Sequence, residues 1–87
     1  MKIMNPIHPG EILKHEFLLP SGLSENSFAE LIGVTEDEIY QLVTGKTGIN
    51  ANLALRFSDY FQNSAEFWMN LQTRYDLEVE KDRARVR

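Results

Sequence analysis

The stretch AELIGVTEDEI, residues 29–39, decides the fold of this chain. Gly33 supplies the positive φ that a tight turn needs at little steric cost. Ala29 is small enough for two helices to approach closely, and Ile39 falls on the inner face of the second helix. This spacing is typical of a helix-turn-helix motif, whose second helix enters the major groove of DNA. An ordinary pair of helices joined at a glycine shows the same pattern, so the motif alone leaves both interpretations open.

Turn and capping signals divide the rest of the chain into helices. Pro9 opens a helix predicted over about residues 9–18, since its missing N–H costs nothing in a first turn. Side chains suited to cap the later helices occur at Ser24, Thr35, Asn50 and Ser64, and Thr35 with Glu38 forms a capping box. No segment alternates as a half-buried strand does, although the tail near Leu77–Val79 allows an extended conformation. The sequence therefore predicts an all-α fold, a compact five-helix helix-turn-helix domain.

Helical spacing also predicts which side chains face inward. In the first helix, the residues at helical spacing are Ile12, Leu13, Glu16 and Phe17. In the next three helices the inward side chains are Phe28, Ala29, Leu31, Ile32, Ile39, Leu42, Val43, Leu53, Ala54, Phe57 and Phe61. In the last helix, Phe67, Trp68, Leu71, Tyr75 and Leu77 are predicted to lie in the core or in a dimer interface. Aromatic side chains suit either place because they bury large areas.

The charge of the chain is unevenly distributed. The net charge is −4, with 13 acidic and 9 basic residues, and four of the basic residues lie in the last seven positions. Much of the affinity for nucleic acid comes from neutralising phosphates, so an acidic body argues against tight DNA binding by the isolated chain. The sequence divides into an N-terminal arm (1–8), the helix-turn-helix domain (9–77) and a charged tail (78–87). The tail is predicted to be a solvated, frayed extension, with contact to a toxin or to DNA as the alternative.

Several classes of protein are not expected from this composition. No apolar run approaches the roughly 18 residues that a membrane span needs, the start of the chain has no signal-peptide core, and cysteine is absent. We therefore expect a cytoplasmic protein without a membrane partner. His8 and His15 lack further metal ligands, and no phosphate loop or nucleophile set is present. No enzyme, metal site or cofactor is predicted.

Several motifs together resemble one known family. They are HPGEIL (8–13), GLS (22–24), TGKTGI (44–49), ALR (54–56) and EFWxxLQxxYDL (66–77). In this order and spacing the chain is similar, over residues 5–79, to the HigA/VapI antitoxin family with its lambda-repressor-like helix-turn-helix. The resemblance implies a homodimer that binds operator double-stranded DNA of its own operon. It also implies a partner, a HigB-like toxin that cleaves mRNA on the ribosome.

The candidate DNA-binding residues surround the third helix. They are Ser24, Asn26, Ser27, Thr35, Glu36, Asp37, Tyr40, Gln41, Thr44 and Lys46. Gln41 is suited to pair with adenine, while Tyr40 and Lys46 are suited to contact phosphates. Each assignment has a structural alternative, in which the acids only stabilise the helix start, Ser24 only caps and Lys46 is only solvated. For Arg56, an internal ion pair is favoured over a DNA contact.

The acids of the third helix depart from the pattern of the family, which carries neutral or basic residues at some of these positions. Acidic side chains repel phosphate, so this departure weakens the expectation of unaided DNA binding. A protein-binding module or a solitary regulator is therefore the alternative function. Acidity would at the same time steer the chain toward a basic toxin.

Overall fold

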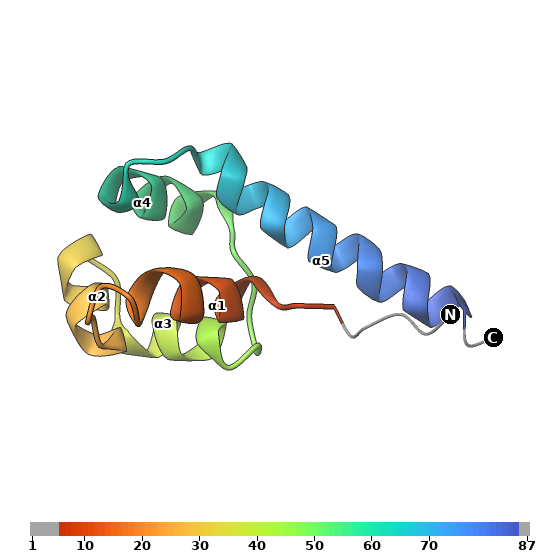
Figure 1. Ribbon diagram of the computed structural model, residues 1–87, viewed down its shortest axis with the longest axis horizontal. Helices are drawn as coiled ribbons and strands as arrows, with labels where there is room; N and C mark the ends of the chain where they lie inside the picture. The colour runs from red at the N-terminus through yellow and green to blue at the C-terminus, as the bar shows by residue number, and fades with distance from the viewer. Residues whose placement is uncertain (1–5, 86–87) are drawn as a thin grey trace.

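The computed structural model describes residues 6–85, which form helices and no strand. The helices are α1 (Pro9–Ile12), η1 (Leu13–Leu18), α2 (Glu25–Ile32), α3 (Glu36–Val43), α4 (Ala51–Phe61) and α5 (Ala65–Arg85). The π-helix η1 continues α1 without a break, so the two act as the first helix of the fold (Figure 1). The predicted all-α fold of five helices is confirmed.

The predicted caps define where the helices begin. The side chains of Ser24, Asn50 and Ser64 accept hydrogen bonds from the backbone N–H groups of Ser27, Leu53 and Phe67, at 3.0, 2.9 and 3.0 Å. His8 opens α1 in the same way, because its Nδ1 accepts from the N–H of Gly10 at 2.9 Å. Each cap satisfies a backbone donor that has no partner within its own helix.

The helix-turn-helix consists of α2 and α3, joined at Gly33. Gly33 has a φ of 80°, and its N–H and that of Val34 both donate to the carbonyl of Ala29, at 2.9 and 3.0 Å. This left-handed residue ends α2 and turns the chain sharply into α3. Ala29 and Ile39 are both buried, as the spacing of the motif predicted.

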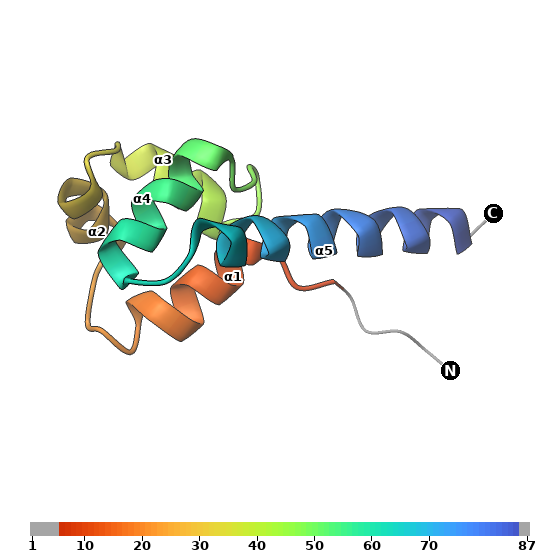
Figure 2. The same cartoon turned by 90° about the horizontal axis from the view of Figure 1, so that it is seen from above.

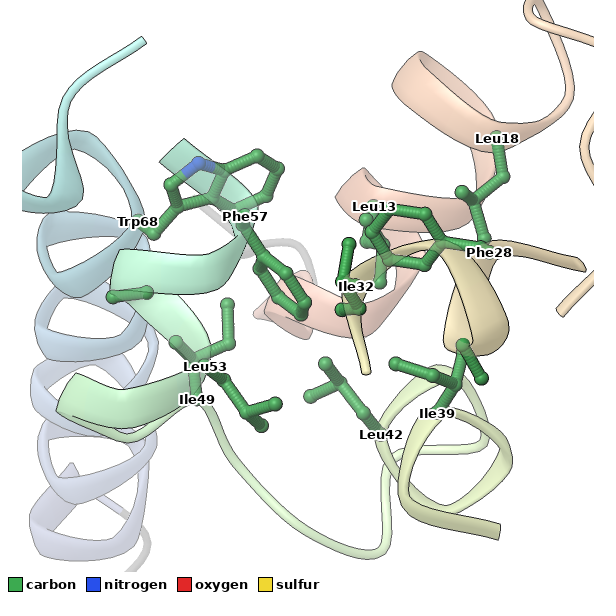
Figure 3. Packing of buried hydrophobic residues seen from close by; sticks show 12 residues of the cluster. Leu13, Leu18, Phe28, Ile32, Ile39, Leu42, Ile49, Leu53, Phe57 and Trp68 are labelled. Carbon is green, nitrogen blue, oxygen red and sulfur yellow. The ribbon is translucent and has the colours of Figure 1, made fainter. Parts of the chain in front are cut away.

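The core lies between the first four helices and the start of α5 (Figure 3). Leu13, Phe28, Ile39, Phe57 and Trp68 are completely buried, each from a different helix. Aromatic rings extend this core beneath α5, where the ring of Trp68 packs 5.1 Å from that of Phe57, measured between centroids. The indole N–H of Trp68 donates to Oδ1 of Asn63 at 2.8 Å, so its one polar group is satisfied inside the packed region.

Leu31 was predicted to face the core, and this prediction is wrong. Its side chain is 56% exposed, while Phe28, Ala29 and Ile32 fill the inward stripe of α2. Leu31 lies on the flank of that stripe, and this short, eight-residue helix leaves that flank uncovered.

The last helix, α5, extends beyond the body of the protein (Figures 1 and 2). Its 21 residues span about 31 Å at the usual rise per residue, which gives the molecule dimensions of 43 × 21 × 21 Å. The extended conformation allowed near Leu77–Val79 is wrong, because α5 continues through the charged tail to Arg85. Opposite charges one helical turn apart favour this helix, as in the ion pair between Arg83 and Glu80 at 3.1 Å.

Two predicted segments lie partly outside the described residues. Residues 1–5 of the N-terminal arm and residues 86–87 of the tail are not described. Across the described part of the chain, none of the helices combines the length and the apolar character that crossing a membrane demands.

Candidate nucleic-acid interface

The outward face of α3 carries the central residues of the candidate interface. Ile39 and Leu42 are completely buried, so the helix cannot rotate about its axis without exposing them. This orientation leaves Glu36, Asp37 and Tyr40 exposed, as predicted. Gln41 is half-buried and Thr44 exposed on the same face. The structure therefore gathers these five predicted side chains into one ridge, which we call the α3 ridge.

Thr44 and Gln41 of the α3 ridge differ in whether their polar groups are available to bind DNA. The hydroxyl of Thr44 donates to the carbonyl of Tyr40 at 2.8 Å, so it is already bound to its own helix. The side-chain amide of Gln41 makes only a long contact of 3.5 Å with Oδ1 of Asp37. Since a contact of this length is weak, Gln41 keeps the donor and the acceptor that pairing with adenine requires.

The N-terminus of α3 is strongly acidic and firmly capped. The hydroxyl of Thr35 accepts from the N–H of Glu38 at 3.1 Å, and the Glu38 carboxylate accepts from the N–H of Thr35 at the same distance. This capping box engages Thr35 and Glu38, so Glu36 and Asp37 are the acids of the first turn that lie outside it. They stabilise the positive end of the helix dipole, but they also concentrate negative charge where a recognition helix meets base edges.

A surface groove joins the N-terminal ends of α2 and α3. Its lining includes the predicted residues Ser24, Asn26 and Glu36, together with Lys14 from η1. Ser27, also predicted, is exposed in the first turn of α2. Lys14 is not among the predicted residues, although basic residues are scarce in the body of the chain. Only the fold brings it from η1 to the two helix ends.

Lys46 lies at the other end of the α3 ridge. The N–H groups of Lys46 and Thr47 both donate to the carbonyl of Gln41, at 2.9 and 3.3 Å, so the loop folds back on the last turn of α3. Gly45 makes this possible with a φ of 82°. The Lys46 side chain is exposed beside the ridge, in a position suited to contact a phosphate next to a groove.

His8 packs against the same loop, with its ring next to Gly45. Its ring lies edge-on to that of Tyr75 in α5, with centroids 4.8 Å apart. Burial lowers the pKa of His8 from its ordinary value of 6.5, while a hydrogen bond to the backbone of Thr47 and the charges of Glu11 and Asp76 oppose this shift. His8 is thus a structural residue, and no group of three potential metal ligands occurs within residues 6–85.

Arg56 holds the helix-turn-helix in place from within. Its Nη1 donates to the carbonyl of Ile32 at 2.7 Å, and its Nε donates to Oδ1 of Asn52 at 3.0 Å. The prediction of an internal role agrees with these contacts, but the predicted ion pair is wrong. The partner is a helix-terminal carbonyl beside Gly33, a group that the end of α2 leaves without an intrahelical donor.

The five aromatic and apolar candidates of α5 occupy different environments. Trp68 is completely buried, and Leu71 and Tyr75 are half-buried against the body. Phe67 is 38% exposed and Leu77, two residues beyond Tyr75 along α5, is 55% exposed. Trp68 is therefore a core residue, whereas Phe67 and Leu77 present apolar surface to the outside.

Known proteins similar to this chain are antitoxins and transcriptional regulators, although no family model matches the sequence. Virulence-associated protein I of Dichelobacter nodosus is 43% identical over 84 residues, which cover 95% of this chain and 78% of that protein. Antitoxin HigA-1 of Vibrio cholerae is 36% identical over 72 residues, covering 83% and 68% of the two chains.

Solved structures agree with these relatives. The Pseudomonas aeruginosa antitoxin HigA, determined with the higBA promoter, superimposes with a TM-score of 0.84 at 43% identity and covers 86% of this chain and 82% of that one. Proteins of this kind are DNA-binding regulators and not enzymes. The chain therefore belongs to the family of helix-turn-helix antitoxins and transcriptional regulators that includes HigA and virulence-associated protein I.

Proposed function

We propose that this chain is the antitoxin of a HigBA-type module, a homodimer that binds its own operator, represses its operon and neutralises a HigB-like mRNA endonuclease. The α3 ridge carries the DNA-binding part of this proposal. It presents Gln41 with its amide available and is continued by Lys46, on a helix fixed by the buried Ile39 and Leu42. The similarity to a HigA determined with promoter DNA supports the same assignment.

Dimerisation would allow two α3 ridges to bind two half-sites of one operator. Two recognition helices related by a two-fold axis read half-sites about 34–36 Å apart, or a multiple of that distance. The exposed Leu77 and Phe67 on α5 support this helix as the pairing surface. Light scattering over a range of protein concentrations measures the mass directly, and a monomer at all concentrations contradicts the homodimer.

The acidity of the chain supports the toxin as a partner. A toxin that binds ribosomal RNA and mRNA needs a basic surface, and a chain of net charge −4 is attracted to such a surface over long distances. Binding a basic toxin also reduces the negative charge of the assembly. We therefore expect the toxin-bound form to bind operator DNA more tightly than the antitoxin alone. As a regulator of transcription, the protein would act in the cytoplasm.

The decisive experiment measures binding to a duplex from the region upstream of its own coding sequence, at several salt concentrations. A scrambled duplex of the same length is the control. We expect tighter binding to the upstream duplex and an affinity that falls steeply as salt increases, because phosphate contacts release counterions. Equal affinity for the two duplexes contradicts operator recognition.

The acids at the start of α3 favour one other candidate function. Glu36 and Asp37 repel phosphates at the place where DNA would approach, which suits a protein-binding module whose DNA affinity has been lost. No binding to either duplex at low salt, together with a complex formed with the neighbouring gene product, supports this alternative. Absence of a toxin gene beside its own favours a solitary regulator.

A further inference from the structure

The side-chain amide of Gln72 in α5 binds the loop that carries Lys46. Oε1 of Gln72 accepts the backbone N–H of Ile49 at 2.7 Å, across 23 positions of sequence. Its Nε2 donates to Oδ1 of Asp76 at 2.9 Å, one turn further along α5. The amide is therefore oriented at both ends, since its acceptor points at the loop while its donor is held by a carboxylate.

The loop itself is shaped to receive this amide. A Cβ on Gly48 would come 2.8 Å from Oε1 of Gln72, closer than carbon and oxygen normally approach. Only glycine leaves room for the side-chain amide to reach the N–H of Ile49. Gly48 is not among the glycines of positive φ, so this close approach, rather than a left-handed turn, accounts for the glycine.

We propose that Gln72 is a positioning residue for DNA binding, which fixes residues 45–49 so that Lys46 stays beside the α3 ridge. The proposal rests on the proposed function, because it assigns a role to the loop in contacting phosphates. Lys46 is bound to α3 through its backbone N–H, and three residues later Ile49 is bound to α5. Because these two anchors are only three residues apart, the backbone that carries the lysine is already ordered, and less entropy is lost when DNA binds.

The test uses Gln72→Met, which removes both hydrogen bonds while keeping net charge and similar length. With the upstream duplex as probe, we expect about three- to tenfold weaker binding, within the range of couplings between neighbouring groups. The salt dependence should also become shallower, toward the slope of Lys46→Ala, which loses about one phosphate contact per subunit. In the Lys46→Ala background, Gln72→Met should have no further effect, because the positioned charge is already absent.

Two matched variants separate positioning from a general loss of stability. Asn63→Ala removes the hydrogen bond to Trp68 at the start of α5, away from the loop, and should lower stability without changing the salt slope. The pair Gln72→Glu with Asp76→Asn keeps an acceptor for Ile49, reverses the bond between residues 72 and 76, and leaves the net charge unchanged. This double variant should have the wild-type affinity for the upstream duplex and the wild-type salt dependence of binding.

Gly48→Ala tests the same contact from the loop side. Its added methyl group meets the end of a flexible side chain, so we expect the protein to fold with the Gln72 amide displaced. Amide hydrogen exchange measures the hydrogen bond between Gln72 and Ile49 without DNA. The N–H of Ile49 should exchange faster in Gly48→Ala and in Gln72→Met than in the wild type, and at the wild-type rate in Asn63→Ala.

Three outcomes overturn the inference, and they can be told apart. If the wild type binds neither duplex, the proposed function fails and the inference fails with it. If the wild type binds but Gln72→Met keeps its affinity and slope, only the positioning role fails. If Asn63→Ala flattens the slope as much as Gln72→Met does, the effect belongs to the stability of α5 and not to the loop.

Discussion

Gly10, in the first turn of α1, lies directly against the backbone carbonyl of Leu42 near the end of α3. A Cβ on residue 10 would overlap the Leu42 oxygen and would come 2.9 Å from Cα of Val43. Backbone on both sides of this contact leaves no flexible atom to move away. The start of the first helix is therefore packed against the recognition helix at a distance that only glycine permits.

Gly10→Ala should destabilise the protein by about 1–3 kcal/mol, the usual cost of forcing extra atoms into a packed region. A loss of stability would be informative, because alanine normally stabilises a helix relative to glycine by about 1 kcal/mol where there is space for its methyl group. Urea unfolding of the purified protein measures the change. Glu30→Ala, on an exposed face of α2, is the control and should stay within about 0.5 kcal/mol of the wild type. A more stable Gly10→Ala protein would contradict the close packing.

His8 should make the stability depend on pH. Burial lowers its pKa in the folded protein below the ordinary 6.5, so the unfolded chain takes up a proton that the folded protein resists. The contribution of His8 is complete above about pH 6.5 and is lost as the pH falls below that value. Protonation at Nδ1 would also remove the acceptor for the N–H of Gly10.

The comparison uses His8→Asn, which keeps a side chain able to cap α1 but does not titrate. Its melting temperature should fall less than that of the wild type between pH 7.5 and 5.5. His15→Asn removes the other histidine, from an exposed position, and should keep the wild-type pattern. If His8→Asn loses as much stability on acidification as the wild type, His8 does not contribute to the pH dependence.

Gln41 and Lys46 should affect DNA binding in different ways. Gln41→Ala should weaken binding to the upstream duplex by about 1–3 kcal/mol if its amide reads a base, with little effect on a scrambled duplex. Lys46→Ala should weaken binding to both duplexes and reduce the salt slope by about one per subunit. Fluorescence anisotropy titrations at three salt concentrations distinguish the two. Equal losses of affinity for both duplexes in Gln41→Ala would show that Gln41 contacts the DNA backbone rather than a base.

The acids at the start of α3 should limit affinity for DNA. Glu36→Gln with Asp37→Asn removes two charges that face the approaching phosphates and leaves the capping box intact, so we expect tighter binding to any duplex. The cost is about 0.3–1 kcal/mol of stability for each lost interaction with the helix dipole. Glu66→Gln with Glu78→Gln, on α5, changes the net charge equally and is the control. An equal gain in the control would show that only total charge matters.

Trp68 and Leu77 should report separately on the core and on the proposed dimer. Trp68→Ala should cost about 3–5 kcal/mol, as deletion of a buried aromatic side chain does. Leu77 is exposed, so Leu77→Ala should leave the unfolding of the monomer unchanged and shift the proposed dimer to lower mass on dilution. Calorimetry and light scattering make the two measurements. An unchanged melting temperature in Trp68→Ala would contradict its place in the core.

The local signals of the sequence predicted the helices well, because a cap or a turn involves residues only a few positions apart. The capping box of Thr35 and Glu38 and the left-handed Gly33 both occur where the sequence indicated them. The continuation of α5 through the charged tail did not follow from these local signals. There the helix carries alternating charges, with the ion pair between Arg83 and Glu80, rather than an apolar stripe, and an apolar stripe is what the periodicity detects.

The candidate site was predicted less completely than the helices. The outward face of α3 follows from helical spacing once Ile39 is known to be buried. Lys14 and Gln72 could not be selected in this way, because each reaches the site from another helix across the fold. Leu31 shows the opposite error. Its apolar character predicted burial, but the fold leaves its side chain exposed.

By itself, the sequence determined the helix-turn-helix, since Ala29, Gly33 and Ile39 act through the shape of the backbone within a few turns. It also determined the acidic start of α3 and the candidates Gln41 and Lys46. Only the tertiary structure decided that Gly10 packs against Leu42 and that Gln72 holds the loop beside Lys46. These contacts join residues more than 20 positions apart, and no local preference of the chain encodes the distance at which such residues meet.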